Sequence, residues 1–362
     1  MRLTGSSTAV LATLMSATAA TAADFPVKAQ QAVPALDRSG FYASIDGSQQ
    51  TINLPAYDLG WKLRSFGPEV NLGPSETYKP RINGYGISGA LGYVVPDGTF
   101  SSSWGERVRF EINTAYAHAE GTASGRGPNN DGFAAQLLDG SFGETNGFGP
   151  ASGVHTRSTL ATDYTAWNVG LKVAADHRFD AVTLTPSLAT FGGHASNNQN
   201  FFQELGMGPG PGGRNYRATS SLRWTDWGAR FGLDGKWQVT NWLSLGLGGS
   251  VGTAWRDTSM TAVDEYNLLG PFAFTAFSGA TGSRTTAPLL ANAKASATLQ
   301  PLPGIALKAF GGLNFDSSVP GISAANYTGS AGNPTTVTPA GIKFGSETSY
   351  FAGGRLTMGF NP

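Results

Sequence analysis

The segment WGARFGLDGKW, residues 227–237, alternates apolar and polar side chains with a period of two. Trp227 and Trp237 lie on one face of this pattern, and Arg230 and Asp234 lie on the other. Successive side chains of a β-strand point to opposite faces, so the segment predicts a strand with one apolar and one charged face. About ten strand residues tilted near 45° cover roughly 23 Å, close to the ~25 Å apolar band of a membrane β-barrel. The two tryptophans therefore mark the ends of a predicted membrane crossing.

Ten segments of the chain show this alternation. A helix does not explain it, because Arg107 and Phe110, three residues apart, would then share a face. No later window offers a run of about 18 apolar residues, so the sequence predicts no transmembrane helix. The predicted strands are residues 40–50, 84–95, 104–119, 162–175, 181–194, 223–238, 242–256, 288–300, 304–316 and 346–360.

The connections between these strands differ sharply in length. Four are short and turn-like, at residues 96–99, 176–180, 239–241 and 301–304. The other five are long and rich in Gly, Asn, Ser and Pro. Outer-membrane barrels have short periplasmic turns and long extracellular loops, and an even strand number places both chain ends in the periplasm. We therefore predict an all-β fold, a transmembrane antiparallel up-and-down β-barrel of ten strands, or of twelve if residues 51–82 or 257–286 hide another hairpin.

Charge is scarce in this chain: 13% of its 362 residues are charged, whereas 50 are glycine. The 24 basic and 24 acidic residues balance, so the basic excess of a nucleic-acid-binding protein is absent. The chain has no cysteine, which excludes disulfides, thiolate metal sites and cysteine nucleophiles. No His, Asp or Glu cluster has metal-ligand spacing, and we expect no cofactor. A barrel explains the low charge, because one face of every strand contacts lipid.

The N-terminal residues have the layout of a secretory signal peptide. Arg2 precedes a modestly apolar stretch around Ala9–Met15, and Ala20-Thr21-Ala22 fits the small-x-small cleavage rule. The stretch is too short to span a bilayer as a helix. We predict a signal peptide at residues 1–22, a periplasmic leader at 23–38 and the barrel at 39–362.

Both ends of the mature chain resemble those of a known class. The start AADFPVKA, residues 22–29, and the pattern of strands and long loops are similar to proteobacterial porin-like outer-membrane β-barrel proteins. The last strand resembles the insertion signal of that class, with Tyr350, Ala352, Gly354, Leu356, Met358 and Phe360 on one face. It departs from the class in ending on Asn361 and Pro362. The resemblance implies a Gram-negative outer membrane, contact with lipids and lipopolysaccharide, and insertion by the barrel-assembly machinery through this strand.

Aromatic residues near strand ends are candidates for the two girdles that border the apolar band. Packing in a core is the alternative for each of them taken singly. The candidates are Trp104, Tyr116, Trp167, Trp227, Trp237, Trp242, Trp255 and Phe360.

The face opposite the lipid is the predicted lumen, and most of its positions are small. Eight strands are just filled by their own side chains, so ten strands lined by small residues predict some water-filled space. The predicted inward bases are Arg107, Arg109, Lys172, Arg230, Lys236, Arg256, Lys294, Lys308 and Arg355. The predicted inward acids are Asp46, Glu111, Asp234 and Asp316. Basic rings favour anions, so we predict a narrow, mildly anion-selective pore for small hydrophilic solutes. The alternative is a plugged barrel whose charges pair internally.

Two enzymatic functions are less favoured alternatives to the pore. His194-Ala195-Ser196-Asn197 resembles a motif of outer-membrane phospholipases and lipid A deacylases, with Ser196 as nucleophile and Glu204 to orient His194. The match is short, and the alternation of side chains along the strand places His194 and Ser196 on the lipid-facing row. A protease of the omptin type would need paired aspartates and a His–Asp couple, and no such pairs stand out. We therefore do not expect an enzyme.

A structural or adhesive barrel acting through its extracellular loops is the third hypothesis. The segments 51–82, 121–158 and 257–286 are rich in aromatic residues, which would bind a partner or fold the loops over the barrel mouth. These aromatics include Trp61, Phe66, Phe142, Phe148 and Phe272.

Overall fold

The computed structural model describes residues 39–65, 70–96, 99, 107–128, 133–136, 138–139, 142–146, 155–206, 214–268, 274–330 and 333–360. The predicted signal peptide and leader, Trp104 and the last two residues lie outside this part of the chain. No helix among the described residues is long and apolar enough to cross a membrane.

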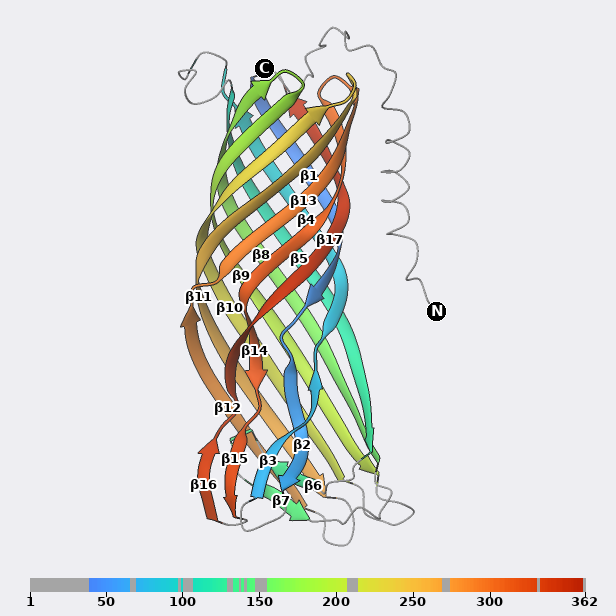
Figure 1. Ribbon diagram of the computed structural model, residues 1–362, viewed down its shortest axis with the longest axis vertical. Helices are drawn as coiled ribbons and strands as arrows, with labels where there is room; N and C mark the ends of the chain where they lie inside the picture. The colour runs from blue at the N-terminus through green and yellow to red at the C-terminus, as the bar shows by residue number, and fades with distance from the viewer. Residues whose placement is uncertain are drawn as a thin grey trace.

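The strands form an antiparallel up-and-down barrel (Figure 1). Its sheet has eleven strands in the order β10-β9-β8-β5-β4-β1-β17-β14-β13-β11-β12, and pairing of β10 with β11 closes the ring. Successive parts of β11 pair with β13 and then β12, so these two strands share one position in the ring. The bounds are β1 (Gly40–Asn53), β4 (Arg81–Val94), β5 (Arg107–Pro128), β8 (His155–Phe179), β9 (Val182–Gly206), β10 (Arg214–Gln238), β11 (Leu243–Leu268), β12 (Phe274–Thr286), β13 (Leu289–Leu302), β14 (Ile305–Ser323) and β17 (Gly341–Phe360).

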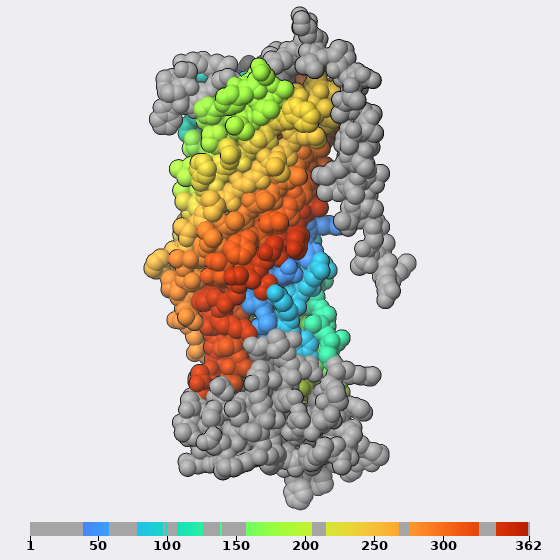
Figure 2. All heavy atoms as spheres, in the orientation of Figure 1, coloured from blue at the N-terminus to red at the C-terminus, as the bar shows by residue number. Residues whose placement is uncertain are grey.

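The first and last strands of the ring lie side by side. Phe41 of β1 pairs with Phe360 of β17, and the ladder continues to Thr51 and Tyr350. Figure 2 shows this seam as the contact between the blue and the red parts of the surface. The ten strand positions of the ring match the ten predicted strands, so the periodicity of the sequence identified every one of them.

An apolar band covers the outer face of the barrel near the end where the strands are joined by short turns. The side chains of this band include Trp227 and Leu247, which are 66% and 74% exposed. Side chains this apolar and this exposed require lipid around them. The chain is therefore a membrane β-barrel, with the apolar band as its membrane-spanning part.

Tight turns define one end of the barrel, hereafter the short-turn end. β8 and β9 are separated by Asp180 and Ala181, and β13 and β14 by Pro303 and Gly304. Asp180 has a φ of 52° and Gly304 a φ of 79°, the left-handed region that tight turns use. The predicted turn at residues 176–180 is shorter than expected, because β8 continues to Phe179.

The wall continues well beyond the apolar band at the other end, hereafter the long-loop end. The predicted loops at residues 195–222 and 257–287 were wrong: β9, β10, β11 and β12 extend through most of them as strands. Their alternation is inverted, because Leu222 is buried inside while Arg223 and Asp257 are exposed outside. Water in place of lipid around this part of the wall explains the inversion. A search for lipid-facing apolar rows does not detect these strands, because their outer face is polar and they contain many Gly, Asn and Ser residues.

Two small sheets lie at the long-loop end, at the bottom of Figure 1. One has the order β16-β15-β3-β2, and the other pairs β6 with β7. The segment 51–82 does hold a hairpin, but this hairpin pairs with β15 and does not join the ring. The barrel therefore does not have twelve strands in its ring. The bounds are β2 (Tyr57–Ser65), β3 (Val70–Tyr78), β6 (Phe133–Gln136), β7 (Phe142–Asn146), β15 (Asn326–Ser330) and β16 (Asn333–Thr338).

Candidate functional site

Ion pairs join nearby strands along the lumen wall in the short-turn half of the barrel. Arg109 Nη2 lies 2.9 Å from Asp176 Oδ1, and Lys294 Nζ lies 3.1 Å from Asp234 Oδ1. Arg355 donates from both Nε and Nη2 to the Asp46 carboxylate, each at 2.5 Å, and Tyr42 donates to Glu111 at 2.9 Å. We call these residues, together with two further lysines, the charged layer: Tyr42, Asp46, Arg109, Glu111, Lys172, Asp176, Asp234, Lys294, Lys308 and Arg355.

The lumen is less basic than the sequence predicted. Two acids that the sequence analysis did not place inside, Asp176 and Asp226, bind Arg109 and Arg256. Asp176 fell in a predicted turn, and Asp226 is separated from its partner Arg256 by 30 positions along the chain. Arg107 and Lys236 lie near the short-turn end of β5 and β10.

Two lysines of the charged layer have no direct counter-ion. Among the described residues, Lys172 and Lys308 form no ion pair. Lys308 pairs in register with Arg355, and Lys172 pairs in register with Glu111. With five bases and four acids, the charged layer keeps a formal excess of one positive charge.

The charged layer is accessible to water from within the barrel. The side chains of Arg109 and Lys294 are both 33% exposed although they point into the lumen. Beyond the layer lies a cavity of about 510 Å³, hereafter the mid-barrel cavity. Its lining includes Gln50, Asn113, Tyr164, Asn168, Phe191, Trp224, Arg230 and Arg256.

Neighbouring side chains occupy the space above two of the lumen glycines. A Cβ added at Gly248 would lie 1.9 Å from Asp234 Oδ1, and one at Gly92 would lie 2.2 Å from the Tyr42 ring. Long side chains of one strand therefore lie across the glycines of the next. These glycines accommodate packed neighbours and do not border free water.

A buried arginine joins three strands beside the mid-barrel cavity. Arg256, which is 2% exposed, donates from Nε and Nη2 to the two oxygens of Asp226, each at 2.7 Å. Its Nη2 also lies 2.8 Å from Asp316 Oδ2, and its Nη1 donates to the Ser318 carbonyl at 2.8 Å. Every nitrogen of the guanidinium has a partner, so two acids share one well-bonded base.

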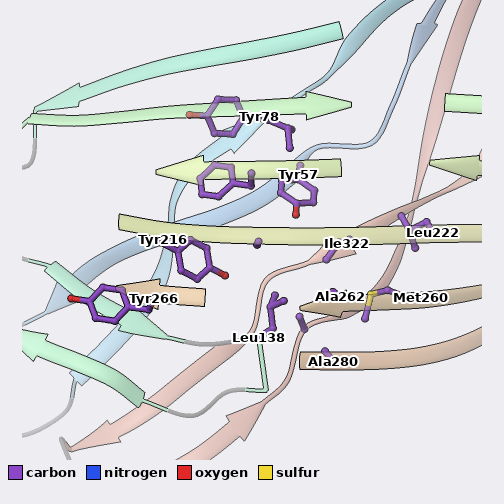
Figure 3. Close-up of a cluster of buried hydrophobic side chains, with 14 of the residues drawn as sticks. Tyr57, Tyr78, Leu138, Tyr216, Leu222, Met260, Ala262, Tyr266, Ala280 and Ile322 are labelled. Atoms are coloured by element: carbon purple, nitrogen blue, oxygen red, sulfur yellow. The ribbon is translucent and has the colours of Figure 1, made fainter. Parts of the chain in front are cut away.

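An apolar core fills the barrel at the long-loop end (Figure 3). Wall strands contribute Tyr216, Leu222 and Tyr266, each 0% exposed. Connecting segments enter the mouth and contribute further members. We call this cluster the long-loop core: Tyr57, Tyr78, Leu138, Leu160, Ala195, Phe201, Tyr216, Ala218, Leu222, Trp224, Met260, Ala262, Tyr266, Ala280, Ile322 and Ala340. Because its members exclude water, the core closes the lumen at this end.

Asp264 holds one of these connecting segments in the mouth. The carboxylate is 4% exposed and accepts hydrogen bonds from the Leu138 backbone N–H at 2.9 Å, from Tyr216 Oη at 3.0 Å and from Ser278 Oγ at 2.5 Å. The Ala340 N–H donates to the Leu138 carbonyl at 2.8 Å. Leu138 is thus fixed through both of its backbone polar groups.

Asp264→Asn removes a pH dependence of stability. Burial raises the pKa of Asp264 above its ordinary value of 3.8, although its three hydrogen bonds oppose the shift. The folded state therefore takes up a proton at a higher pH than the unfolded state, and the wild type gains stability as the pH falls through the folded-state pKa towards 3.8. Urea midpoints from tryptophan fluorescence measure this gain against the variant, which lacks it. Parallel pH profiles for the two proteins would contradict the assignment.

The hydrolase candidates are not brought together as a catalytic triad. Ser196 Oγ lies 2.7 Å from Thr165 Oγ1, and His194 Nδ1 lies 3.4 Å from Thr225 Oγ1. Glu204 lies eight residues beyond Ser196 on the same extended strand, which is roughly 26 Å at about 3.3 Å per residue. The nucleophile, base and orienting acid of the hypothesis therefore do not form one site. The described residues also hold no group of three or more His, Asp or Glu residues that would bind a metal.

The structure does form one His–Asp contact that the sequence analysis missed. His118 Nδ1 lies 4.0 Å from Asp163 Oδ1, because β5 and β8 pair with Glu120 opposite Asp163. The His118 ring lies 5.7 Å from the ring of Tyr85, which is exposed on the outer face. This contact therefore belongs to the outer border of the apolar band and not to the barrel mouth.

The other predicted aromatic residues divide into two groups. The described girdle candidates are all exposed on the outer surface: Tyr116, Trp167, Trp227, Trp237, Trp242, Trp255 and Phe360. Among the loop aromatics, Trp61 lies in β2 and Phe142 in β7, whereas Phe66, Phe148 and Phe272 fall outside the described residues.

Comparison with known proteins finds solved barrel structures of low similarity and no related sequence. No family model and no curated protein matches its sequence. Similar solved structures include the outer membrane protease OmpT of Escherichia coli, at 12% identity and a TM-score of 0.39, covering 88% of this chain and 96% of that one. The translocator domain of the autotransporter NalP of Neisseria meningitidis has 11% identity and a TM-score of 0.31, covering 98% of each chain. A Pseudomonas aeruginosa FadL homologue has 9% identity and a TM-score of 0.21, covering 89% and 91%.

Proposed function

We propose that this chain is an outer-membrane barrel of Gram-negative bacteria that conducts small hydrophilic solutes through a gated lumen. The observation that carries the proposal is the polar, water-accessible lumen inside the apolar band, together with the mid-barrel cavity on its long-loop side. A barrel that served only as a structural anchor would have no need of a hydrated interior. The long-loop core closes this lumen in the conformation described, so the wild type rests closed.

The orientation follows from the two ends of the barrel. Short turns face the periplasm in outer-membrane barrels, and long loops face outwards. The charged layer then faces the periplasm, and the long-loop core faces the outside. The chain begins and ends its ring at the short-turn end, as export and insertion from the periplasm require.

Lys172→Gln with Lys308→Gln removes the anion preference of the open lumen. These two lysines form no ion pair among the described residues, and replacing both changes the formal charge of the charged layer from one positive to one negative. The reversal potential of open channels under a KCl gradient shifts from mildly anion-selective to neutral or cation-selective. Arg223→Gln, which removes a positive charge from the exposed outer face of β10, is the matched control. A wild-type preference for cations would overturn the proposed selectivity.

Liposome swelling tests the proposed pore itself. Vesicles containing the wild type swell slowly in small sugars and salts. In planar bilayers the wild type shows rare opening events. Vesicles that remain as tight as protein-free controls, even after the long-loop core is opened by mutation, would overturn the pore.

A second candidate is a surface barrel that acts through its long-loop end. The specific observation in its favour is the wall that extends beyond the apolar band with its own core and a polar outer face. This part of the molecule is built like a water-soluble domain raised above the membrane. Tight liposomes, combined with capture of a surface partner that depends on the long-loop end, favour this candidate over the pore.

A further inference from the structure

The mid-barrel cavity has the size and setting of a binding site. Its volume of about 510 Å³ lies within the roughly 300–1,000 Å³ typical of small-molecule sites. It is closed on one side by the long-loop core, and on the other side it adjoins the water-accessible charged layer. A solute that enters from the short-turn end therefore reaches a chamber with no open exit.

The walls of the cavity combine aromatic faces with free amide groups. Trp224 and Tyr164 pack as an aromatic pair with ring centroids 6.0 Å apart, and Phe191 lines the cavity with them. Asn113 and Asn168 also line it, and among the described residues their side-chain amides donate no hydrogen bond. Each amide offers a donor and an acceptor to an occupant.

The charges around the cavity cancel. Arg256 is neutralised by Asp226 and Asp316, and Arg230 stacks over Phe191 at 4.4 Å within the field of the same two acids. The third acid of the lining, Glu347, lies 3.3 Å from the ammonium group of Lys79. Three bases therefore balance three acids around the cavity, and no net charge is left to attract an ion. Its guanidinium and amide donors suit hydroxyl groups.

Unpaired polar atoms also lie in the wall near the cavity, outside its lining. Asn197, which is 1% exposed, has neither its Nδ2 nor its Oδ1 hydrogen-bonded, and it follows Ala195 of the cavity wall on the same face of β9. The Thr258 hydroxyl, next after Arg256 on the inner face of β11, is also buried and unbonded. Buried polar groups of native proteins have partners, so ordered water is the partner expected for these enclosed atoms.

We infer that the mid-barrel cavity binds a neutral polyhydroxylated molecule of the mono- or disaccharide class. Its C–H faces stack on the aromatic walls, and its hydroxyls bind the amides and Arg230. The inference names the solute class of the proposed pore and so rests on that function for its physiological meaning. Binding itself requires only entry from the short-turn end.

Equilibrium dialysis of the purified full-length barrel in detergent, with radiolabelled glucose, maltose and sucrose, tests the inference. At least one sugar binds saturably, and Trp224→Ala weakens this binding at least tenfold. Trp227→Ala, three positions away on the lipid-facing side, is the matched control and leaves it unchanged. Ala166→Leu, which fills the cavity without removing a wall, abolishes binding in a barrel that retains its heat-modifiable migration.

Two outcomes would overturn the inference. One is the absence of saturable binding of any of the three sugars, which leaves water as the occupant. The other is tighter binding of gluconate or phosphate than of the sugars, which would show that Arg230 acts as an uncompensated cation. A barrel that binds sugar but never conducts would instead overturn the proposed pore and leave the site intact.

Discussion

Replacing Tyr57–Tyr78 by Gly-Gly opens the barrel and raises single-channel conductance at least about tenfold, as expected when an apolar constriction is removed. The deletion removes Tyr57 and Tyr78 from the long-loop core. It also removes the hairpin whose β3 pairs with β15 across the mouth. Water then reaches the mid-barrel cavity from the long-loop end.

The geometry of the wall tolerates this deletion. Asn53 and Arg81 are paired in register, and the Leu54 N–H donates to the Pro80 carbonyl at 3.0 Å, so β1 and β4 end next to each other. A short loop therefore joins them without disturbing the ring. Phe277→Ala is the control, because Phe277 is 71% exposed on the wall at the same end and lies outside the core. Equal conductance of the wild type and the deletion variant would contradict closure by the core.

Arg256→Met destabilises the barrel by about 3–5 kcal/mol, the usual cost of removing one partner from a buried ion pair. The change leaves the carboxylates of Asp226 and Asp316 facing each other inside the lumen without their shared base. The urea midpoint, followed by tryptophan fluorescence, measures the loss.

Two further variants separate charge from packing. Arg223→Met, which changes an exposed arginine on the neighbouring strand, leaves the midpoint close to that of the wild type. Asp226→Asn and Asp316→Asn added to Arg256→Met recover most of the stability, because they remove the uncompensated charges. A loss that persists in this triple variant would assign the effect to packing.

The membrane-spanning half of the barrel was predictable because lipid imposes one rule on every strand. Trp227, Phe231 and Leu247 must be apolar to face lipid, so a search for alternate apolar positions finds their strands. The long-loop half follows the opposite rule. Tyr216 and Leu222 point inwards, and their strands carry polar residues outside, so the same search reads them as loops.

The alternation of side chains along the strands predicts which charged residues face the lumen, but it does not predict which of them form ion pairs. The alternation places Arg109 and Asp234 on the inner face, whereas the partner of each base depends on register and on the curvature of the ring. Asp176 reaches Arg109 diagonally from the adjacent strand, where its register partner is Arg107. Asp226 reaches Arg256, its direct register partner on β11. Sequence alone therefore predicts a charged lumen and overestimates its net charge.

The absence of native cysteine allows the most direct test of a lumen closed to the outside. Single cysteines at Ser48, which lines the mid-barrel cavity, and at Ser259, which is exposed on the wall beyond the apolar band, report the two compartments. In intact cells, a small membrane-impermeant maleimide labels Ser259→Cys rapidly and Ser48→Cys hardly at all. Permeabilising the outer membrane, which admits the reagent from the short-turn end, makes Ser48→Cys reactive. Labelling of Ser48→Cys in intact cells as fast as Ser259→Cys would contradict the closed, periplasm-facing lumen.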